Sequence, residues 1–526
     1  MRPDHLGSYG YARPTSPELD ALAAQSVVFE RSWAPAPRTR PSFRSSFTGR
    51  DALDAVGAPN TAETFQANGF ATAGFVANMH LTPRFGFDQG FDHWELHNGE
   101  DAGPQVDRAL AWMREHQHED TFLFLHLMDP HLFYRAPGTF HDLFVEDPDP
   151  TLPETFNRWG AVRWERGGEL TEQRIAHITG LYDGEIAYMS SEVGRMMDEL
   201  DRVAPNTVVL FHTDHGEELW DHDGFEHNHT LYDEVVRTAL WLRPAPGMNI
   251  EPRRLSEPVA LWDIGPTLTE LAGLQGPPTD GRSLVGLATG DDPGGWEREL
   301  PVAHLMYDVE QWGVVARDHK YVLHTTSGEE RLYDLAADPG ERRDLSQSTD
   351  LEPFRAALSR AHNMPVGPGW RIEVDLRPGE PFVWTLPAPA EHAFVIDPEA
   401  NRRGRANQVW GERPPVLPED VATVELSADG TTLTIAPGTT GEGVVGVIFA
   451  EPVAPGGELT RNGEVLETFG SSQALRLRSQ GGELTARLGT VCYPPPGEAP
   501  RMQALEAADA DALDLLEALG YIGGGE

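Results

Sequence analysis

The sequence predicts an α/β fold in which a mostly parallel central sheet is flanked by helices, with a small antiparallel subdomain and a β-rich accessory module. Two observations predict this class. Over roughly the first 350 residues, short apolar runs alternate with stretches of helical periodicity, the pattern of a parallel sheet covered by helices. After about residue 365, short segments of alternating polarity take over, and these favour antiparallel strands.

The elements of the first part follow from apolar spacing. Helical periodicity predicts helices at residues 16–24, 61–68, 104–117 and 172–203, and β-like runs predict strands at 72–76, 121–127 and 206–211. The last two strands are largely apolar, as expected of strands that are buried on both faces. The sheet that they form is therefore expected to be central.

The later part of the chain carries shorter signals. Alternating segments predict strands at 422–426, 432–435, 444–449 and 475–477, with hairpin turns at Asp429-Gly430 and Asn462-Gly463. Leucines at helical spacing between residues 505 and 519, followed by a glycine, predict a terminal helix. We therefore expect a first domain over 1–364, the β-rich module over 365–496 and a C-terminal helix over 497–526.

Composition excludes several classes of function. A net charge of −42, from 41 Lys and Arg against 83 Asp and Glu, opposes binding to nucleic acid and to anionic lipid. The single lysine, Lys320, is not followed by Ser or Thr, which excludes a phosphate-binding P-loop. The single cysteine, Cys492, excludes an intrachain disulfide and a Cys-rich zinc site. Apolar stretches stay below the roughly 20 residues that span a bilayer, so we expect a soluble chain.

Histidines cluster in one segment of the chain. Five of the 20 lie within residues 212–229, where acidic residues are interleaved with them. The cluster follows the predicted strand 206–211, so Asp214 and His215 are expected at its carboxyl end, where open α/β sheets bind ligands. A carboxylate beside an imidazole suits a divalent metal ion. The alternative is a solvated loop that happens to hold histidines.

Further motifs run along the chain in a fixed order. They lie at 2–11, 15–20, 85–92, 182–186, 263–268, 332–341 and 519–522, and the His-rich segment contributes 213–218, 221–222 and 225–234. In sequence and order they resemble the sulfatase family of the alkaline-phosphatase superfamily. The resemblance implies an alkaline-phosphatase-like fold and hydrolysis of sulfuric esters, with phosphoric esters as the runner-up. The β-rich module lies outside it.

The family's nucleophile motif is altered in this chain. In the family, a Cys or Ser that is oxidised to formylglycine begins a motif that corresponds here to residues 39–49. Thr39 occupies the nucleophile position, and threonine cannot become that aldehyde, so the resemblance implies a hydroxyl nucleophile like that of phosphoesterase relatives. Phe43 replaces the motif arginine, with Arg44 next to it. The alternative for Thr39 is a loop residue capping a helix that starts near Pro41.

The resemblance also implies roles for other residues. A divalent metal ion (Ca, Mg, Mn or Zn, not distinguished) would be held by Asp214 and His215 and would activate Thr39. A small anionic ester would be held by Arg40 and Arg44. The expected acid and oxyanion contacts are His131 and His227, and Asn78 is the expected substrate contact. His131 and Asn78 are alternatively turn residues, and His212, His222 and His229 alternatively lie in an outer layer or on the surface.

The largest departure from the family concerns its first strand. In relatives, that strand ends in a metal-binding Asp, whose position would fall before Met1. One hypothesis is that the natural protein carries this strand upstream, and that it is periplasmic or secreted if a signal precedes the strand. The other is a catalytically impaired relative that binds anions or glycans. For an active enzyme, the alternatives to sulfate esters are phosphate monoesters, phosphodiesters and phosphonates.

Overall fold

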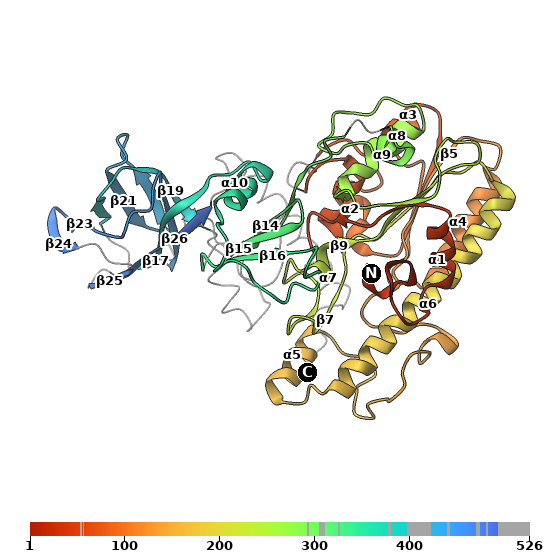
Figure 1. Ribbon diagram of the computed structural model, residues 1–526, viewed down its shortest axis with the longest axis horizontal. Coiled ribbons are helices and arrows are strands. Elements are labelled where there is room, and N and C mark those ends of the chain that lie inside the picture. Colours follow the sequence, from red (N-terminus) through yellow and green to blue (C-terminus); the bar gives the residue numbers. More distant parts are fainter. Residues whose placement is uncertain are drawn as a thin grey trace. The chain divides into compact units, whose positions relative to one another are not determined.

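The computed structural model describes residues 1–492 except 53, 54, 56, 292, 293, 304–310, 325, 326, 377–379, 397–421, 439–441, 470–473, 480 and 481. The chain forms two compact units (Figure 1). Within the described residues, the first comprises 1–227 and 232–297, and the second comprises 228–231 and 298–492. The predicted C-terminal helix at 497–526 lies outside the described residues, and the predicted domain boundaries stay predictions.

The first unit contains a parallel sheet and a mixed sheet. The parallel sheet has the order β4-β3-β5, formed by His93–Leu96, Ala71–Val76 and Thr121–Leu125. The mixed sheet has the order β11-β1-β10-β6, formed by Arg253–Leu255, Val27–Phe29, Leu240–Arg243 and Val209–His212. In the mixed sheet β10 is antiparallel to both β1 and β6, and β1 is parallel to β11. The predicted α/β class is confirmed.

Shorter strands, nine α-helices and several short 3-10 helices complete this unit in its described residues. The strands are β2 (Ser32–Trp33), β7 (Glu218–Leu219), β8 (Phe225–Glu226), β9 (Arg237–Thr238) and β12 (Val259–Ala260). The helices are α1 (Pro17–Ala24), α2 (Thr39–Thr48), α3 (Thr61–Ala67), α4 (Ala102–Glu115), α5 (Arg158–Gly167), α6 (Glu172–Val203), α7 (Asp233–Val236), α8 (Ile264–Leu271) and α9 (Val285–Thr289). No helix in the described part of the chain combines the length and apolar character that a bilayer crossing requires.

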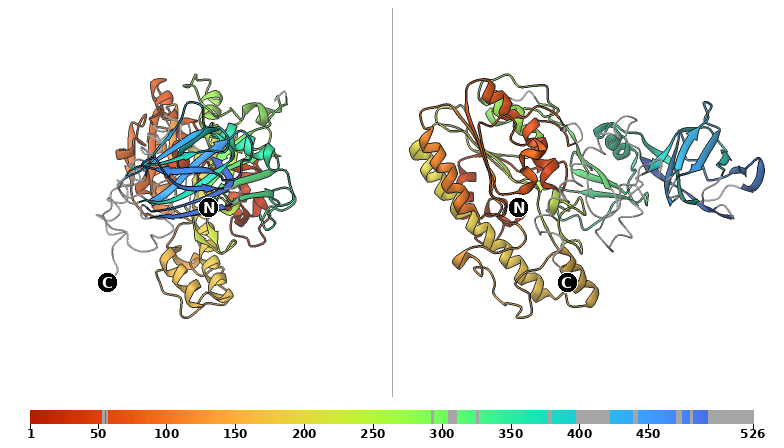
Figure 2. Two further views of the ribbon diagram at one scale, coloured as in Figure 1. Left: turned by 90° about the vertical axis from the view of Figure 1, so that its left-hand side faces the viewer. Right: turned by 180° about the vertical axis from the view of Figure 1, so that it is seen from behind.

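Helices cover both faces of the parallel sheet. On one face, α4 and the long α6 lie along the parallel sheet (Figure 2). Trp112 of α4 and Met196 of α6 share a core there with Phe75 of β3. On the other face, Phe43 and Phe47 of α2 pack against Phe124 of β5. The layers place the N-terminus of α2 near the carboxyl ends of the strands, because Phe43 also contacts the ring of His212, the last residue of β6.

The expected elements form, but one expectation about their burial was wrong. The predicted helices correspond to α1, α3, α4 and α6, and the predicted strands to β3, β5 and β6. However, the side chains of β5 and β6 are only half-buried along their whole length. The reason is position: within the described residues β5 pairs only with β3, and β6 only with β10, so each strand forms the edge of its sheet.

The second unit is built from antiparallel sheets. Its first sheet has the order β13-β14-β15-β16, formed by Glu299–Val302, Gln311–Ala316, His319–His324 and Glu330–Asp334, and α10 (Glu352–Ala361) follows it. This is the expected small antiparallel subdomain. On β15 the side chain of Lys320 is buried and donates to Glu341 at 2.9 Å.

Two further sheets form the β-rich part of the second unit. One has the order β19-β22-β17-β26-β25, formed by Ala390–Ile396, Glu442–Phe449, Val366–Leu376, Gly482–Cys492 and Ala474–Ser479. The other has the order β20-β21-β18-β23-β24, formed by Ala422–Leu426, Thr432–Pro437, Phe382–Thr385, Gly457–Arg461 and Glu464–Phe469. They share one core, in which the rings of Trp370 and Trp384 lie 5.1 Å apart. The predicted hairpin turns at Gly430 and Gly463 are confirmed, and both glycines have positive φ.

Candidate active site

Thr39 is the first residue of α2 and is buried. The helix begins here, earlier than the start near Pro41 that the sequence predicts, because the amide of Ser42 already donates to the carbonyl of Arg38 at 3.3 Å. The hydroxyl of Thr39 therefore lies at a helix N-terminus, where unpaired amides favour a bound anion. Phe43, at the position of the family's arginine, is buried among aromatic rings and carries no charge.

His215 connects Thr39 to Asp214. Its Nε2 lies 3.3 Å from Thr39 Oγ1 and 3.4 Å from Asp214 Oδ2. Its Nδ1 lies 2.8 Å from the carbonyl oxygen of Gly216, which can only accept, so Nδ1 carries the proton of the neutral ring. Burial lowers the pKa of His215 to about 4. At neutral pH its Nε2 therefore presents a lone pair toward Thr39 and Asp214.

Asp214 supplies an ionised carboxylate to the same place. Burial alone raises its pKa, but the positive charges of His215 and of the N-terminal ammonium oppose this and lower the pKa to about 2. An ionised carboxylate and a neutral imidazole are donors that fit a divalent cation in kind. Among the described residues, no group of three or more His, Cys, Asp or Glu side chains is arranged to hold a metal.

Two more histidines continue this cluster. The ring centroid of His227 lies 4.3 Å from that of His215, and that of His131 lies 6.1 Å from that of His227. The Nδ1 of His227 donates to Glu217 Oε1 at 2.9 Å, which leaves Nε2 as the other reactive nitrogen. Burial lowers the pKa of His131 and raises the pKa of Glu217. The structure thus links Thr39 to both predicted histidines through His215.

The predicted anion-binding residues Arg40 and Arg44 of α2 contact the neighbouring segment 79–85. The guanidinium of Arg40 lies over the ring of Phe85 at 3.9 Å, and its Nη2 lies 3.2 Å from His80 Nδ1. Arg44 donates to the carbonyl of Phe85 at 3.2 Å. Asn78 Oδ1 accepts from the amide of His80 at 2.9 Å, so Asn78 caps this turn, as its alternative interpretation expected.

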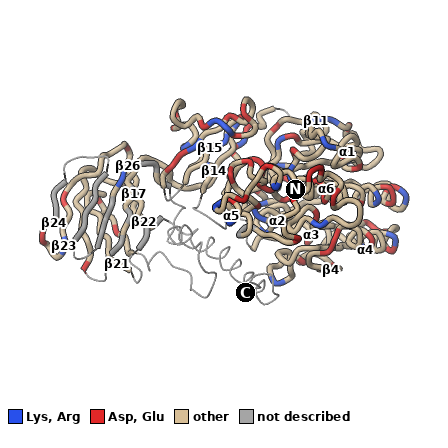
Figure 3. Tube along the Cα trace, turned by 90° about the horizontal axis from the view of Figure 1, so that it is seen from below, with Lys and Arg blue, Asp and Glu red and all other residues tan. Residues whose placement is uncertain are grey.

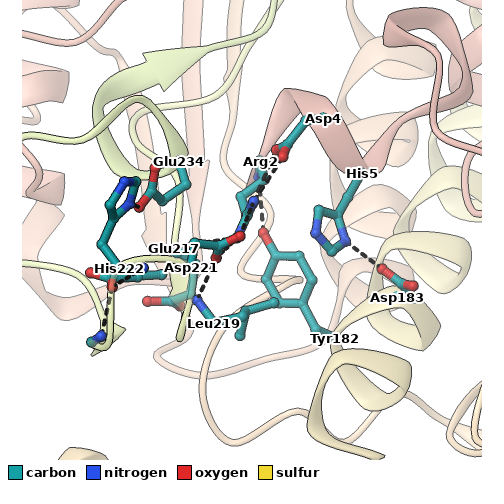
Figure 4. A network of polar contacts seen from close by, with 12 residues as sticks. Arg2, Asp4, His5, Tyr182, Asp183, Glu217, Leu219, Asp221, His222 and Glu234 are labelled. Atoms are coloured by element: carbon teal, nitrogen blue, oxygen red, sulfur yellow. Dashed lines mark hydrogen bonds and ion pairs between the residues drawn. The ribbon is translucent and has the colours of Figure 1, made fainter. Parts of the chain in front are cut away.

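The N-terminal segment holds the His-rich loop against α6 (Figure 4). Arg2 donates to the carbonyl of Glu217 at 3.3 Å and pairs with both Asp4 and Asp221. The amide of Arg2 donates to the hydroxyl of Tyr182 on α6 at 2.9 Å. These contacts fix the backbone next to His215 and His227.

The outer histidines and three further residues were not assigned roles from the sequence. Nδ1 of His222 contacts Glu234, and its ring stacks on Tyr232 at 3.6 Å, which places it outside the Thr39 cluster. Sequence reasoning missed Glu217, His80 and Glu185. Glu217 carried a signal, because it lies in the same motif as Asp214 and His215. Glu185 carried a similar signal, because it lies in the motif 182–186, whereas His80 acts through a tertiary contact that leaves no mark on local spacing.

Comparison with known proteins identifies the family. The sulfatase family model matches residues 1–274, and the model described as N-sulphoglucosamine sulphohydrolase, C-terminal, matches residues 221–363. The first match spans more than half of the chain. The chain therefore belongs to the sulfatase family of the alkaline-phosphatase superfamily, hydrolases that act on sulfuric ester bonds with phosphoesters as related substrates. Members of this family generally use a divalent metal ion.

Individual relatives are distant. The arylsulfatase of Clostridium perfringens is 22% identical over 432 residues, covering 67% of this chain and 89% of that protein. The Delta 4,5-hexuronate-2-O-sulfatase of Bacteroides thetaiotaomicron is 23% identical, covering 68% of this chain and 86% of that protein. The solved phosphonate monoester hydrolase of Agrobacterium radiobacter has a TM-score of 0.55 at 20% identity, covering 68% of this chain and 92% of that one. This structural likeness shows the fold.

Proposed function

We propose that the chain is a metal-dependent hydrolase of small sulfate esters in which Thr39 is the nucleophile. The observation that carries the proposal is the 3.3 Å contact between Thr39 Oγ1 and His215 Nε2 at the N-terminus of α2. The hydroxyl of Thr39 is buried there beside an ionised carboxylate and a neutral imidazole. Such surroundings are those of an activated nucleophile.

Asp214 and His215 are the side chains that would hold the metal. When bound, a divalent ion lowers the pKa of a nearby hydroxyl and offsets the negative charge of the ester oxygens. Arg40 and Arg44 of α2 bring positive charge to the site, and Asn78 caps the turn that carries His80, the partner of Arg40. The positive end of the α2 helix dipole favours the anion at the same place.

The proton of the reaction is assigned to His227. Thr39 Oγ1 releases its proton to solvent water and forms the new bond to sulfur, and the bond from sulfur to the alcohol oxygen breaks. His227 acts from its doubly protonated form, which the carboxylate of Glu217 at 2.9 Å from Nδ1 stabilises, and its Nε2 donates a proton to the departing oxygen. His131, on the far side of His227, contacts the oxygens of the ester group. A water oxygen then bonds to sulfur, the bond from sulfur to Thr39 Oγ1 breaks, and Thr39 regains its proton as sulfate leaves.

Phosphoryl transfer is the second candidate function. Thr39 favours it, since a threonine cannot supply formylglycine and a hydroxyl nucleophile suits phosphate monoesters, phosphodiesters or phosphonates. Family membership favours sulfate esters. The third candidate is a catalytically impaired relative that binds anions or glycans. It is favoured because, among the described residues, Asp214 and His215 are not joined by a third His, Cys, Asp or Glu side chain that could hold a metal.

Turnover of an ester panel tests these alternatives. Purified protein is assayed with sulfate monoesters, phosphate monoesters, phosphodiesters and phosphonates, each with and without Ca²⁺, Mg²⁺, Mn²⁺ or Zn²⁺. We expect Thr39→Ala and Asp214→Ala to lose at least about a hundredfold in kcat. Thr48→Ala is the matched control, because its hydroxyl only donates to Arg44 O at the far end of the same helix. Full activity in Thr39→Ala would remove the assigned nucleophile, and no turnover of any ester would favour the binding relative.

A further inference from the structure

Phe133 is an exposed aromatic side chain two residues after His131 of the candidate active site. It is 43% exposed, and among the described residues only Leu143, Val465 and Leu466 are comparably exposed large apolar side chains. It follows His131 closely in sequence, and His131 lies within the cluster that leads through His227 and His215 to Thr39. A single exposed Phe is ordinary on a protein surface. Two further features of Phe133 call for an explanation: its position shortly after His131, and the hydrogen bonds that hold its backbone in place.

The segment alternates between core and surface. Tyr134 and Ala136 are buried in the core of the first unit, whereas Phe133 and Arg135 are exposed. The guanidinium carbon of Arg135 lies 5.9 Å from the ring centroid of Phe133. The ring and the cation therefore form one continuous surface, here called the Phe133–Arg135 platform.

One buried carboxylate anchors the platform at both ends. Glu185 of α6 is 5% exposed, and its Oε2 accepts from the amide of His131 at 2.8 Å. Its Oε1 accepts from the amide of Arg135. The backbone that carries Phe133 is thus tied to the same helix side chain that positions His131. An aromatic ring fixed in this way loses little conformational entropy when a ligand covers it.

Arg135 has a weak partner of its own. It donates to the carbonyl of Glu154 at 3.3 Å, and the carboxylate of Glu154, 93% exposed, lies 4.0 Å away. An ion pair this exposed is worth little, because solvent screens it. The guanidinium can therefore exchange this contact for an anionic group on a ligand.

We infer that the Phe133–Arg135 platform binds the organic part of the substrate, and that this part is a ring with an apolar face and an anionic substituent. The inference rests on the proposed function, since it takes His131 as part of the active site. The apolar face of the ring packs on Phe133, and the substituent accepts from Arg135. A flexible acyclic ester would use neither contact.

Matched pairs of esters test the platform. Cyclohexyl sulfate is compared with n-hexyl sulfate for the ring, and 4-carboxycyclohexyl sulfate with cyclohexyl sulfate for the substituent. We expect Phe133→Ala to raise KM for both cyclic esters about tenfold while leaving n-hexyl sulfate unchanged. Arg135→Gln should raise KM only for the carboxylated ester. Phe133→Trp should preserve the preference for the ring, and Leu143→Ala, an exposed apolar control, should change nothing.

Calorimetric titration with 4-carboxycyclohexyl sulfate separates this inference from the proposed function. Weaker binding in Phe133→Ala supports the platform even if wild-type protein turns over no ester, an outcome that would remove the proposed function alone. Turnover with equal KM for cyclic and acyclic esters would overturn the platform and leave the proposed function standing. A Phe133→Ala protein that keeps its affinity but changes its mass in sedimentation would also overturn it, because the ring would then be a contact between copies.

Discussion

Glu217 controls the orientation and the protonation of the His227 ring. Its buried carboxylate accepts a hydrogen bond from His227 Nδ1 at 2.9 Å. A negative charge at this position stabilises the protonated ring and directs Nε2 away from Glu217. A neutral glutamine keeps the shape and can still accept from Nδ1, but it removes the charge. The role of Glu217 is therefore testable without removing the hydrogen bond.

We expect Glu217→Gln to lower kcat by about tenfold to a hundredfold and to move the alkaline limb of the pH–rate profile to lower pH, since the proton on His227 is held less tightly. The measurement is kcat/KM against pH with the best ester of the panel. Glu218→Gln is the control: its Oε1 accepts from the amides of His222 and Gly224, so it alters the same loop without reaching His227. An unshifted profile in Glu217→Gln would make Glu217 a structural residue only.

At this scale the sequence indicated which segments come together better than it indicated the hydrogen-bond partners within them. The contact of Thr39 with His215 was foreseeable, because helix N-termini and strand carboxyl ends meet on one side of an α/β sheet. The partner of His227 was not, because it depends on turns at Trp220, Asp223 and Glu226, where non-glycine residues have positive φ. Local spacing does not encode such turns.

Whole elements followed the sequence when their signals were local. Helix α6 was predicted over 172–203 and occurs as Glu172–Val203, because Thr171 caps it by accepting from the amide of Arg174 at 3.1 Å. The burial of β5 and β6 was not predicted correctly, since it depends on which strands pair beside them. Sheet order is a property of the assembled layer, and apolar runs do not specify it.

The start of α4 depends on a buried carboxylate from another element. Asp129 Oδ2, in the segment after β5, accepts from the amide of Ala102 at 2.9 Å. Burial, aided by the charge of Asp101, raises the pKa of Asp129 to about 7. The folded protein thus holds a proton on Asp129 between about pH 4 and pH 7 that the unfolded chain releases. Its stabilising contribution is complete below about pH 4 and is lost as the pH rises through 7.

We expect the free energy of unfolding of the wild-type protein to fall across this window by at most about 4 kcal/mol from Asp129. In Asp129→Asn, which can still accept from Ala102, this part of the slope should vanish. The variant should therefore match wild type near pH 4 and exceed it at pH 8. Urea denaturation at pH 4, 6 and 8 measures this, with Asp142→Asn, 77% exposed, as control. Equal slopes in wild type and Asp129→Asn would contradict the assignment.

Across the whole molecule, positive charge is scarce and its placement matters. The net charge is −42, and 41 residues carry all the Lys and Arg charge. Figure 3 shows basic segments interspersed with acidic ones over the described part of the chain. Arginine fills nearly every basic position, and the single lysine is fully buried in the second unit, where it pairs with Glu341 at 2.9 Å. This pair therefore reports on the folding of that unit.

We expect Glu341→Gln to destabilise the second unit by about 3 to 5 kcal/mol, because it leaves the ammonium of Lys320 buried without its carboxylate. The double variant Lys320→Met with Glu341→Leu should be close to wild type in stability, since it removes both charges from the interior.

An amine-reactive reagent measures this unfolding. It should leave Lys320 unmodified in the folded protein and label it as urea unfolds the second unit, and mass spectrometry identifies the labelled site. Glu299→Gln, which breaks an exposed pair with Arg360, is the control and should leave the labelling midpoint unchanged. Labelling of Lys320 in the native protein, or a Glu341→Gln variant with an unchanged midpoint, would show that the pair does not stabilise the unit, because only a buried and compensated charge gives both protection and a large cost of disruption.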